Sequence, residues 1–83
     1  MSGASKYQIR QWLNEGLAQE ATHVIIVCDT FDYEDYPVYV MSGQDARKLK
    51  EEYDGKSMQT VMEVYKLSMN LETQLAQLRS FNY

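Results

Sequence analysis

An uninterrupted apolar run, rich in β-branched side chains, extends from Val24 to Cys28. A strand that faces solvent on one side alternates apolar and polar residues, whereas a strand covered on both faces can be apolar throughout. This run therefore predicts a central strand with a layer of structure on each face. A chain of 83 residues has room for one small domain around such a strand.

A first helix is predicted from Ser5, a suitable N-cap, to about Gln19. Gly16 is expected to weaken its last turn. The apolar residues at helical spacing, with Trp12 interpreted as a core anchor, are Ile9, Trp12, Leu13 and Leu17.

The second strand is predicted from Val38 to Met41, with Pro37 at its start, where a missing N–H does least harm. The connection from the first strand is too long for a two-residue hairpin turn, so a true loop is expected. Ser42 is the predicted cap of a second helix from about Gln44 to Tyr53, because Asp45 follows it by three residues.

The second helix is expected to end before Gly55, which suits the left-handed position after a helix. The segment from Met58 to Leu67 is predicted as a third strand, because its β-branched and aromatic content outweighs a helical alternative. Asn70 is then the predicted cap of a last helix. Its apolar stripe is expected to contain Leu71, Leu75, Leu78 and Phe81.

The predicted fold class is α+β, with three helices and a three-stranded antiparallel sheet in the chain order α-β-β-α-β-α. The second helix is expected to cross over right-handedly and to place the third strand beside the first, which gives the strand order 2-1-3. Residues 1–83 form a single small domain. Three short helices are expected to cover such a sheet poorly, so a homo-oligomer is predicted.

Composition excludes several classes of function. The net charge of −4 and the pI near 4.8 argue against a nucleic acid polymer as partner, because binding a phosphate backbone needs a basic face. No stretch has the length and hydropathy of a membrane span or of a signal peptide core. A cytoplasmic protein without membrane contact is therefore expected.

Catalytic patterns are also missing. His23 and Cys28 are the single histidine and the single cysteine, and their odd spacing on one strand points them to opposite faces. We interpret His23 as a half-exposed packing residue and Cys28 as a small buried side chain. The sequence contains no phosphate-binding glycine loop and no zinc-ligand pattern, so a non-enzymatic protein without cofactor or metal is predicted. A metal-dependent hydrolase that uses loop carboxylates is the weaker alternative.

Acidic and aromatic residues alternate after the first strand, from Asp29 to Tyr39. Aromatic side chains anchor protein interfaces and also stack on nucleic acid bases, while carboxylates accept hydrogen bonds or oppose a basic partner. Arg47 and Lys48 are candidate phosphate ligands, from the same chain or from a neighbouring subunit. The alternative is that the rings fold back and complete the core. The predicted binding residues are Asp29, Phe31, Asp32, Tyr33, Asp35, Tyr36, Tyr39, Arg47 and Lys48.

Two segments resemble a family of small uncharacterised proteins of bacteriophage and bacterial genomes. The first is the THVIIVCDTFDYEDYPVYV motif at 22–40, and the second is the SMQTVMEVYKLS motif at 57–68. The resemblance implies a phage or mobile-element setting, in which small proteins without enzymatic motifs often act by binding and counter host defence. It carries no catalytic residue.

Two functions follow as hypotheses. In the first, an oligomeric anti-defence protein sequesters a nucleotide-derived signal, with the rings stacking, the acids accepting hydrogen bonds and the cations meeting phosphate. In the second, the acidic and aromatic loop docks on a host protein, so that the chain acts as an inhibitor or adaptor.

Overall fold

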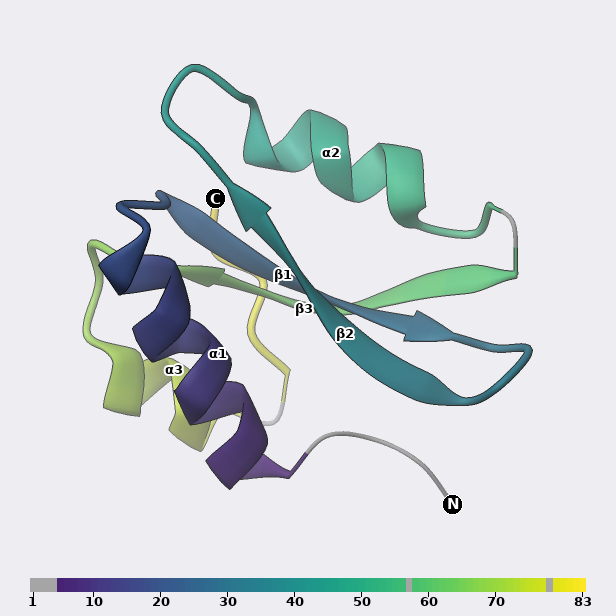
Figure 1. Ribbon diagram of the computed structural model, residues 1–83, viewed down its shortest axis with the longest axis horizontal. Helices are drawn as coiled ribbons and strands as arrows, with labels where there is room; N and C mark the ends of the chain where they lie inside the picture. Colours follow the sequence, from purple (N-terminus) through teal and green to yellow (C-terminus); the bar gives the residue numbers. More distant parts are fainter. Residues whose placement is uncertain (1–4, 57, 78) are drawn as a thin grey trace.

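The computed structural model describes residues 5–56, 58–77 and 79–83. Three helices and three strands occur in the predicted order α-β-β-α-β-α, so the fold class is confirmed (Figure 1). Among the described residues, no helix is both long enough and apolar enough to cross a membrane. The elements are α1 (Lys6–Ala18), β1 (His23–Asp29), β2 (Glu34–Val40), α2 (Ala46–Tyr53), β3 (Gln59–Lys66) and α3 (Leu71–Ala76).

Strand β1 lies in the middle of the sheet and pairs antiparallel with both neighbours, in the predicted order β2-β1-β3. The pairing with β3 contains a bulge, because Ile26 is opposite Glu63 while Val27 is opposite Val61. Without this bulge, Val61 and Val64 would point to opposite faces, since their spacing is odd. The bulge brings both valines onto the face that α2 covers.

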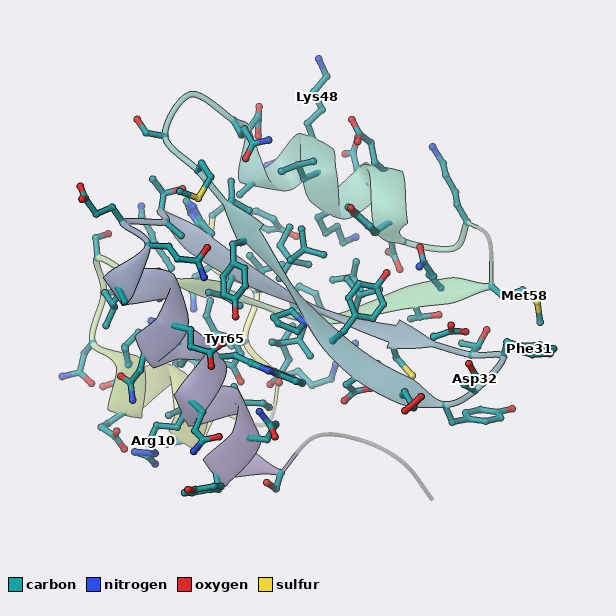
Figure 2. The ribbon with its side chains drawn as sticks, viewed as in Figure 1. Arg10, Phe31, Asp32, Lys48, Met58 and Tyr65 are labelled. Atoms are coloured by element: carbon teal, nitrogen blue, oxygen red, sulfur yellow. The ribbon has the colours of Figure 1, made fainter. Side chains whose placement is uncertain are left out.

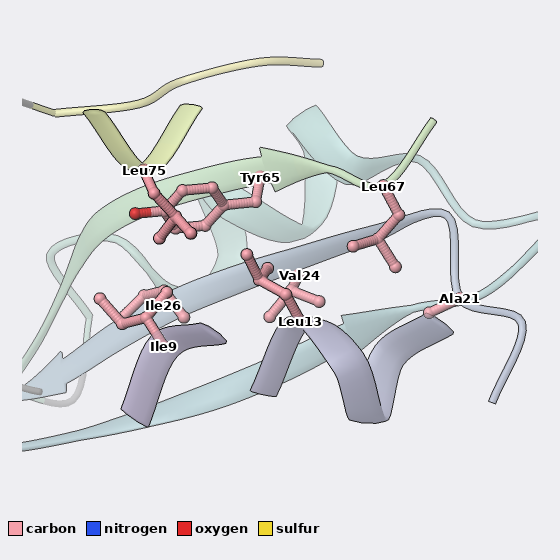
Figure 3. Close-up of a cluster of buried hydrophobic side chains, with 8 residues drawn as sticks. All are labelled: Ile9, Leu13, Ala21, Val24, Ile26, Tyr65, Leu67 and Leu75. Atoms are coloured by element: carbon pink, nitrogen blue, oxygen red, sulfur yellow. The ribbon is translucent and has the colours of Figure 1, made fainter. Parts of the chain in front are cut away.

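Two apolar clusters hold the sheet, one on each face. Helices α1 and α3 cover Val24 and Ile26 of β1, and α2 covers Ile25 and Val27 (Figure 1). These four side chains are almost fully buried, as the uninterrupted apolar run predicts. Figure 3 shows the first cluster, in which α1 and α3 side chains meet β1 and β3. Trp12 packs against this cluster while half-buried, which agrees with its predicted role.

The burial of Val24 to Val27 on both faces of the sheet removes the argument for self-association that we drew from the sequence. Three short helices do cover both faces of the sheet, with α1 and α3 on one face and α2 on the other (Figure 1). A homo-oligomer therefore stays a prediction. The apolar residues of β1 do not need a second copy of the chain to bury them.

Helix α1 begins as expected, since the Ser5 side chain accepts a hydrogen bond from the Gln8 N–H. Gly16 has a role beyond weakening the last turn. A Cβ at this position would lie 2.8 Å from Val24 Cγ2 and 3.1 Å from Leu67 Cδ1, so glycine allows the helix to approach the sheet closely. The prediction for Leu17 was wrong, because this side chain is 47% exposed.

Strand β2 begins earlier than predicted, at Glu34 in place of Val38, and it ends at Val40 without Met41. Pro37 is in the middle of the strand, opposite Ile26. An edge strand tolerates this proline where its nitrogen faces away from the neighbouring strand. The predicted loop from Asp29 to Pro37 is therefore reduced to a turn over residues 30–33.

Helix α2 begins two residues later than predicted, because Asp45 and not Ser42 is its cap. The Asp45 carboxylate accepts hydrogen bonds from the Arg47 and Lys48 N–H groups, at 3.0 and 3.2 Å. An aspartate here satisfies two N–H groups at once, which a serine three residues earlier cannot do. Gly55 follows the helix with φ of +77°, as predicted.

Strand β3 and the Asn70 cap of α3 are confirmed, but α3 ends at Ala76. Leu78 is outside the described residues. The prediction for Phe81 was wrong, because this residue follows the end of α3 and is not helical. The segment from Ser80 to Asn82 runs along the outer edge of β3, with Val64 N–H donating to the Ser80 carbonyl and Asn82 N–H to the Val64 carbonyl. This segment therefore forms hydrogen bonds with β3 in place of continuing α3, and it covers one edge of the sheet.

Candidate binding surface

The turn between β1 and β2 is held by local hydrogen bonds. The Asp29 carboxylate accepts from the Phe31 N–H at 2.8 Å, and the Asp29 carbonyl accepts from the Tyr33 N–H at 2.6 Å. Tyr33 has a left-handed backbone conformation with φ of +58°. Asp29, a predicted ligand-binding residue, therefore shapes the turn.

The turn is also tied to the beginning of β3. The Thr30 N–H and the Thr30 hydroxyl both donate to the Met58 carbonyl, each at 2.7 Å. Met58 is itself left-handed, with φ of +60°. Two segments far apart in the sequence thus meet at one corner of the molecule, where Figure 2 shows Phe31, Asp32 and Met58 together.

Three large apolar side chains at this corner are exposed: Phe31 by 71%, Tyr33 by 61% and Met58 by 58%. We call these three residues the apolar tip. Neighbouring exposed apolar side chains on a small protein indicate a contact surface more often than single scattered ones do. The alternative interpretation, in which the rings of the turn complete the core, is excluded for Phe31 and Tyr33.

Four carboxylates lie in the turn or directly beside it in the strands, and we call them the acidic rim: Asp29, Asp32, Glu34 and Asp35. Asp32 and Glu34 are exposed, while Asp35 is half-buried beside Cys28. Burial raises the pKa of the Cys28 thiol, and the Asp35 and Asp29 carboxylates raise it further. We predicted Cys28 as a buried side chain, whereas the structure leaves it half-buried. The raised pKa keeps its thiol protonated at neutral pH, and a thiol is much less reactive than a thiolate.

The remaining two predicted rings, Tyr36 and Tyr39, are half-buried and pack against the two apolar clusters. Tyr36 lies against the cluster under α2 and accepts a hydrogen bond from Gln59 Nε2 at 2.5 Å. Tyr39 lies on the opposite face and donates to the Glu15 carboxylate at 2.9 Å. Burial, with the Glu15 contact, raises the pKa of Tyr39 to about 12.

Neither predicted cation lies near the apolar tip. Arg47 lies over the ring of Tyr83, 4.2 Å from its centroid, in a hollow that His23 also lines. His23 and Asp29 are the two ends of β1, so about 20 Å separates this hollow from the apolar tip. Figure 2 shows Lys48 directed away from the sheet, far from Phe31 and Asp32. One chain therefore does not bring the predicted rings and cations together.

No catalytic arrangement is visible among the described residues. Within them, no three histidine, cysteine or acidic side chains gather closely enough to hold a metal ion. Both nitrogens of His23 have neighbours in the protein: Nδ1 lies 2.9 Å from the Thr22 hydroxyl and Nε2 lies 3.0 Å from the main-chain oxygen of Tyr83, the last residue. His23 therefore acts in packing, as we interpreted it.

Sequence reasoning missed two residues that the structure places at these ends. We assigned Met58 to a strand. Its left-handed backbone conformation could not be predicted, because methionine, unlike glycine, does not indicate a positive φ. Tyr83 was not considered, although it joins the histidine and the arginine at the other end. Neither contact could be read from spacing along the chain.

Comparisons with family models, with curated proteins and with solved structures give no match to this chain.

Proposed function

We propose that this chain is a non-enzymatic binding protein that docks on a host protein through the apolar tip. The observation that carries the proposal is the joint exposure of Phe31, Tyr33 and Met58 on a turn that hydrogen bonds hold in shape. A preformed turn loses little conformational freedom on binding, and aromatic side chains provide large contact area. The setting that we propose, from the resemblance, is the cytoplasm of a cell infected by a phage.

The acidic rim favours a partner with a basic surface. Asp32 and Glu34 are exposed, and the sequence between Asp29 and Asp45 contains no lysine or arginine. Charges at the edge of an interface chiefly accelerate association, whereas buried rings slow dissociation. We therefore expect association to slow at high salt, and the double variant Asp32→Asn, Glu34→Gln to reduce this salt dependence.

A protein partner fits the geometry better than a nucleotide. A phosphate group near the apolar tip would meet the acidic rim. Of the predicted phosphate ligands, Arg47 lies beside His23 and Tyr83 at the other end of the sheet, and Lys48 points away from the sheet. Sequestration of a nucleotide-derived signal would need a second copy of the chain to provide the cations. Calorimetry with cyclic and linear nucleotides tests that hypothesis, which requires heat of binding together with dimerisation.

The decisive experiment for docking compares three baits in host lysate: the wild type, the Phe31→Ala, Tyr33→Ala variant, and Tyr7→Ala. Tyr7 is a matched control, because it is 70% exposed on α1, outside the turn. We expect a protein that the wild type and Tyr7→Ala recover and that the double variant loses by about tenfold or more, as for removal of interface anchors. Equal recovery by all three baits would exclude docking through the apolar tip.

A further inference from the structure

The two edges of the sheet differ in how far they are covered. On the outer side of β3, the Gln74 amide pairs with both backbone groups of Lys66, at 2.8 and 2.9 Å. Val64 bonds to the segment 80–82 at 2.7 and 3.0 Å, and the Arg79 guanidinium donates twice to one carbonyl at the bulge. These contacts leave little of the β3 edge for a further strand.

The outer edge of β2 has no such cover within the described residues. Its pairing partner is β1 alone, and in Figure 1 neither α1 nor α2 crosses in front of β2. An uncovered edge offers its backbone groups to a strand of another molecule. Every other copy of this chain presents the same edge, so self-pairing through β2 needs a feature that controls it.

Hydrogen bonding at β3 fixes which backbone groups of β2 point outward. In an antiparallel sheet the N–H and C=O of one residue point to the same side, and neighbouring residues alternate. Val64 bonds outward, so Glu63 bonds to its partner Ile26 and turns the backbone groups of Ile26 toward β3. Pro37, the partner of Ile26 on β2, therefore points its nitrogen and carbonyl outward, as does Tyr39 two residues later.

Pro37 is also the central residue of this edge, since β2 runs from Glu34 to Val40. Two copies that pair antiparallel along the whole of β2 are related by a two-fold axis at its centre, which places residue 37 opposite itself. A residue with an N–H would form two hydrogen bonds there, one to the carbonyl of each copy. Proline has no N–H, so both central bonds are missing.

We infer that the outer edge of β2 is a self-complementary pairing surface for a second copy of this chain, and that Pro37 keeps it closed. The acids of β2 do not account for the closure. In the two-fold register Glu34 lies opposite Val40 and Asp35 opposite Tyr39, so like charges do not meet directly. The surface is separate from the apolar tip, and the inference does not rest on docking.

The test is Pro37→Val, which restores the N–H with a residue of high strand propensity. We expect the wild type not to pair through β2, and Pro37→Val to form a dimer with self-association stronger by about tenfold or more, because two backbone hydrogen bonds are gained. Sedimentation equilibrium over a series of protein concentrations measures both. Pro37→Thr repeats the test with a polar side chain that also restores the N–H.

Pro37→Lys is the matched control for the register. It restores the same N–H, but the two-fold axis places the two lysines opposite each other, where like charges repel. Its dimer should be weaker than that of Pro37→Val by about threefold or more, and the difference should shrink at high salt. Equally strong dimers of the valine and lysine variants at low salt would contradict pairing centred on residue 37.

Amide hydrogen exchange locates the pairing on the edge. The Tyr39 N–H points outward, so it should exchange fast in the wild type and slow in Pro37→Val as the protein concentration rises. The N–H groups of Val38 and Val40 point to β1 in each variant, and their protection confirms that the variant folds. A Pro37→Val variant that stays monomeric, or a wild type that protects the Tyr39 N–H with rising concentration, would overturn the inference.

Discussion

The turn over residues 30–33 and the strand β2 that follows it share one alternating pattern of acids and aromatic rings, yet their rings have different roles. Phe31 and Tyr33 project from the turn, whereas Tyr36 and Tyr39 pack on the two faces of the sheet. The difference arises where backbone pairing with β1 begins, at Glu34. A motif that reads as one functional loop is thus divided into a contact surface and a part of the core.

The largest expected effect separates these two pairs of rings by stability. Tyr36→Ala and Tyr39→Ala should each lower the free energy of unfolding by about 2 kcal/mol, because each removes a packed ring and its hydrogen bond. Phe31→Ala and Tyr33→Ala should change it by less than about 0.5 kcal/mol, as for exposed sites. Urea unfolding measures both. Similar losses at all four positions would show that the turn is also part of the core.

A second test uses the hydroxyl of Tyr39. Tyr39→Phe should cost about 1 kcal/mol at neutral pH, because the hydrogen bond to Glu15 is lost. Since the folded pKa is raised to about 12 from an ordinary value near 10, the Tyr39 contribution is complete below pH 10 and is lost as the pH rises toward 12. The stability advantage of the wild type over Tyr39→Phe should therefore shrink in that window. An advantage that stays constant to pH 12 would contradict the assigned environment.

The smallest expected effect concerns the tie between the turn and β3. Thr30→Val keeps the shape of the side chain but removes its hydroxyl bond to the Met58 carbonyl, which should cost about 0.5 to 1 kcal/mol. Thr22→Val is the comparison at the other end of the sheet, where the hydroxyl contacts both the Val40 carbonyl and His23. Thr22→Val should cost more, because two contacts are lost at a half-buried site. The reverse order would indicate that the apolar tip is held more firmly than its exposure suggests.

Much of the fold could be predicted from local patterns. The apolar run of β1, the Ser5 and Asn70 caps and Gly55 act on neighbouring residues, so their consequences were visible in the sequence. The beginning of β2 could not be predicted in the same way. Glu34 and Asp35 have low strand propensity, and their pairing with Asp29 and Cys28 overrides it.

The candidate site divides similarly. The sequence predicted a binding surface within residues 29–36, and the exposure of Phe31 and Tyr33 agrees with that interpretation. It did not indicate Met58, which joins them through a backbone bond to Thr30. It also placed Arg47 with the rings, whereas the direction of α2 places it beside His23 and Tyr83.

By itself, the amino-acid sequence determined the elements, their order and the central position of β1, because periodicity, caps and apolar runs depend on neighbours along the chain. Only the tertiary structure decided which rings are exposed, that Met58 joins the turn, and that Arg47 lies beside His23 and Tyr83 at the far end of the sheet. These outcomes depend on strand register and on contacts between distant segments, where a shift of one residue turns a side chain from one face of the sheet to the other.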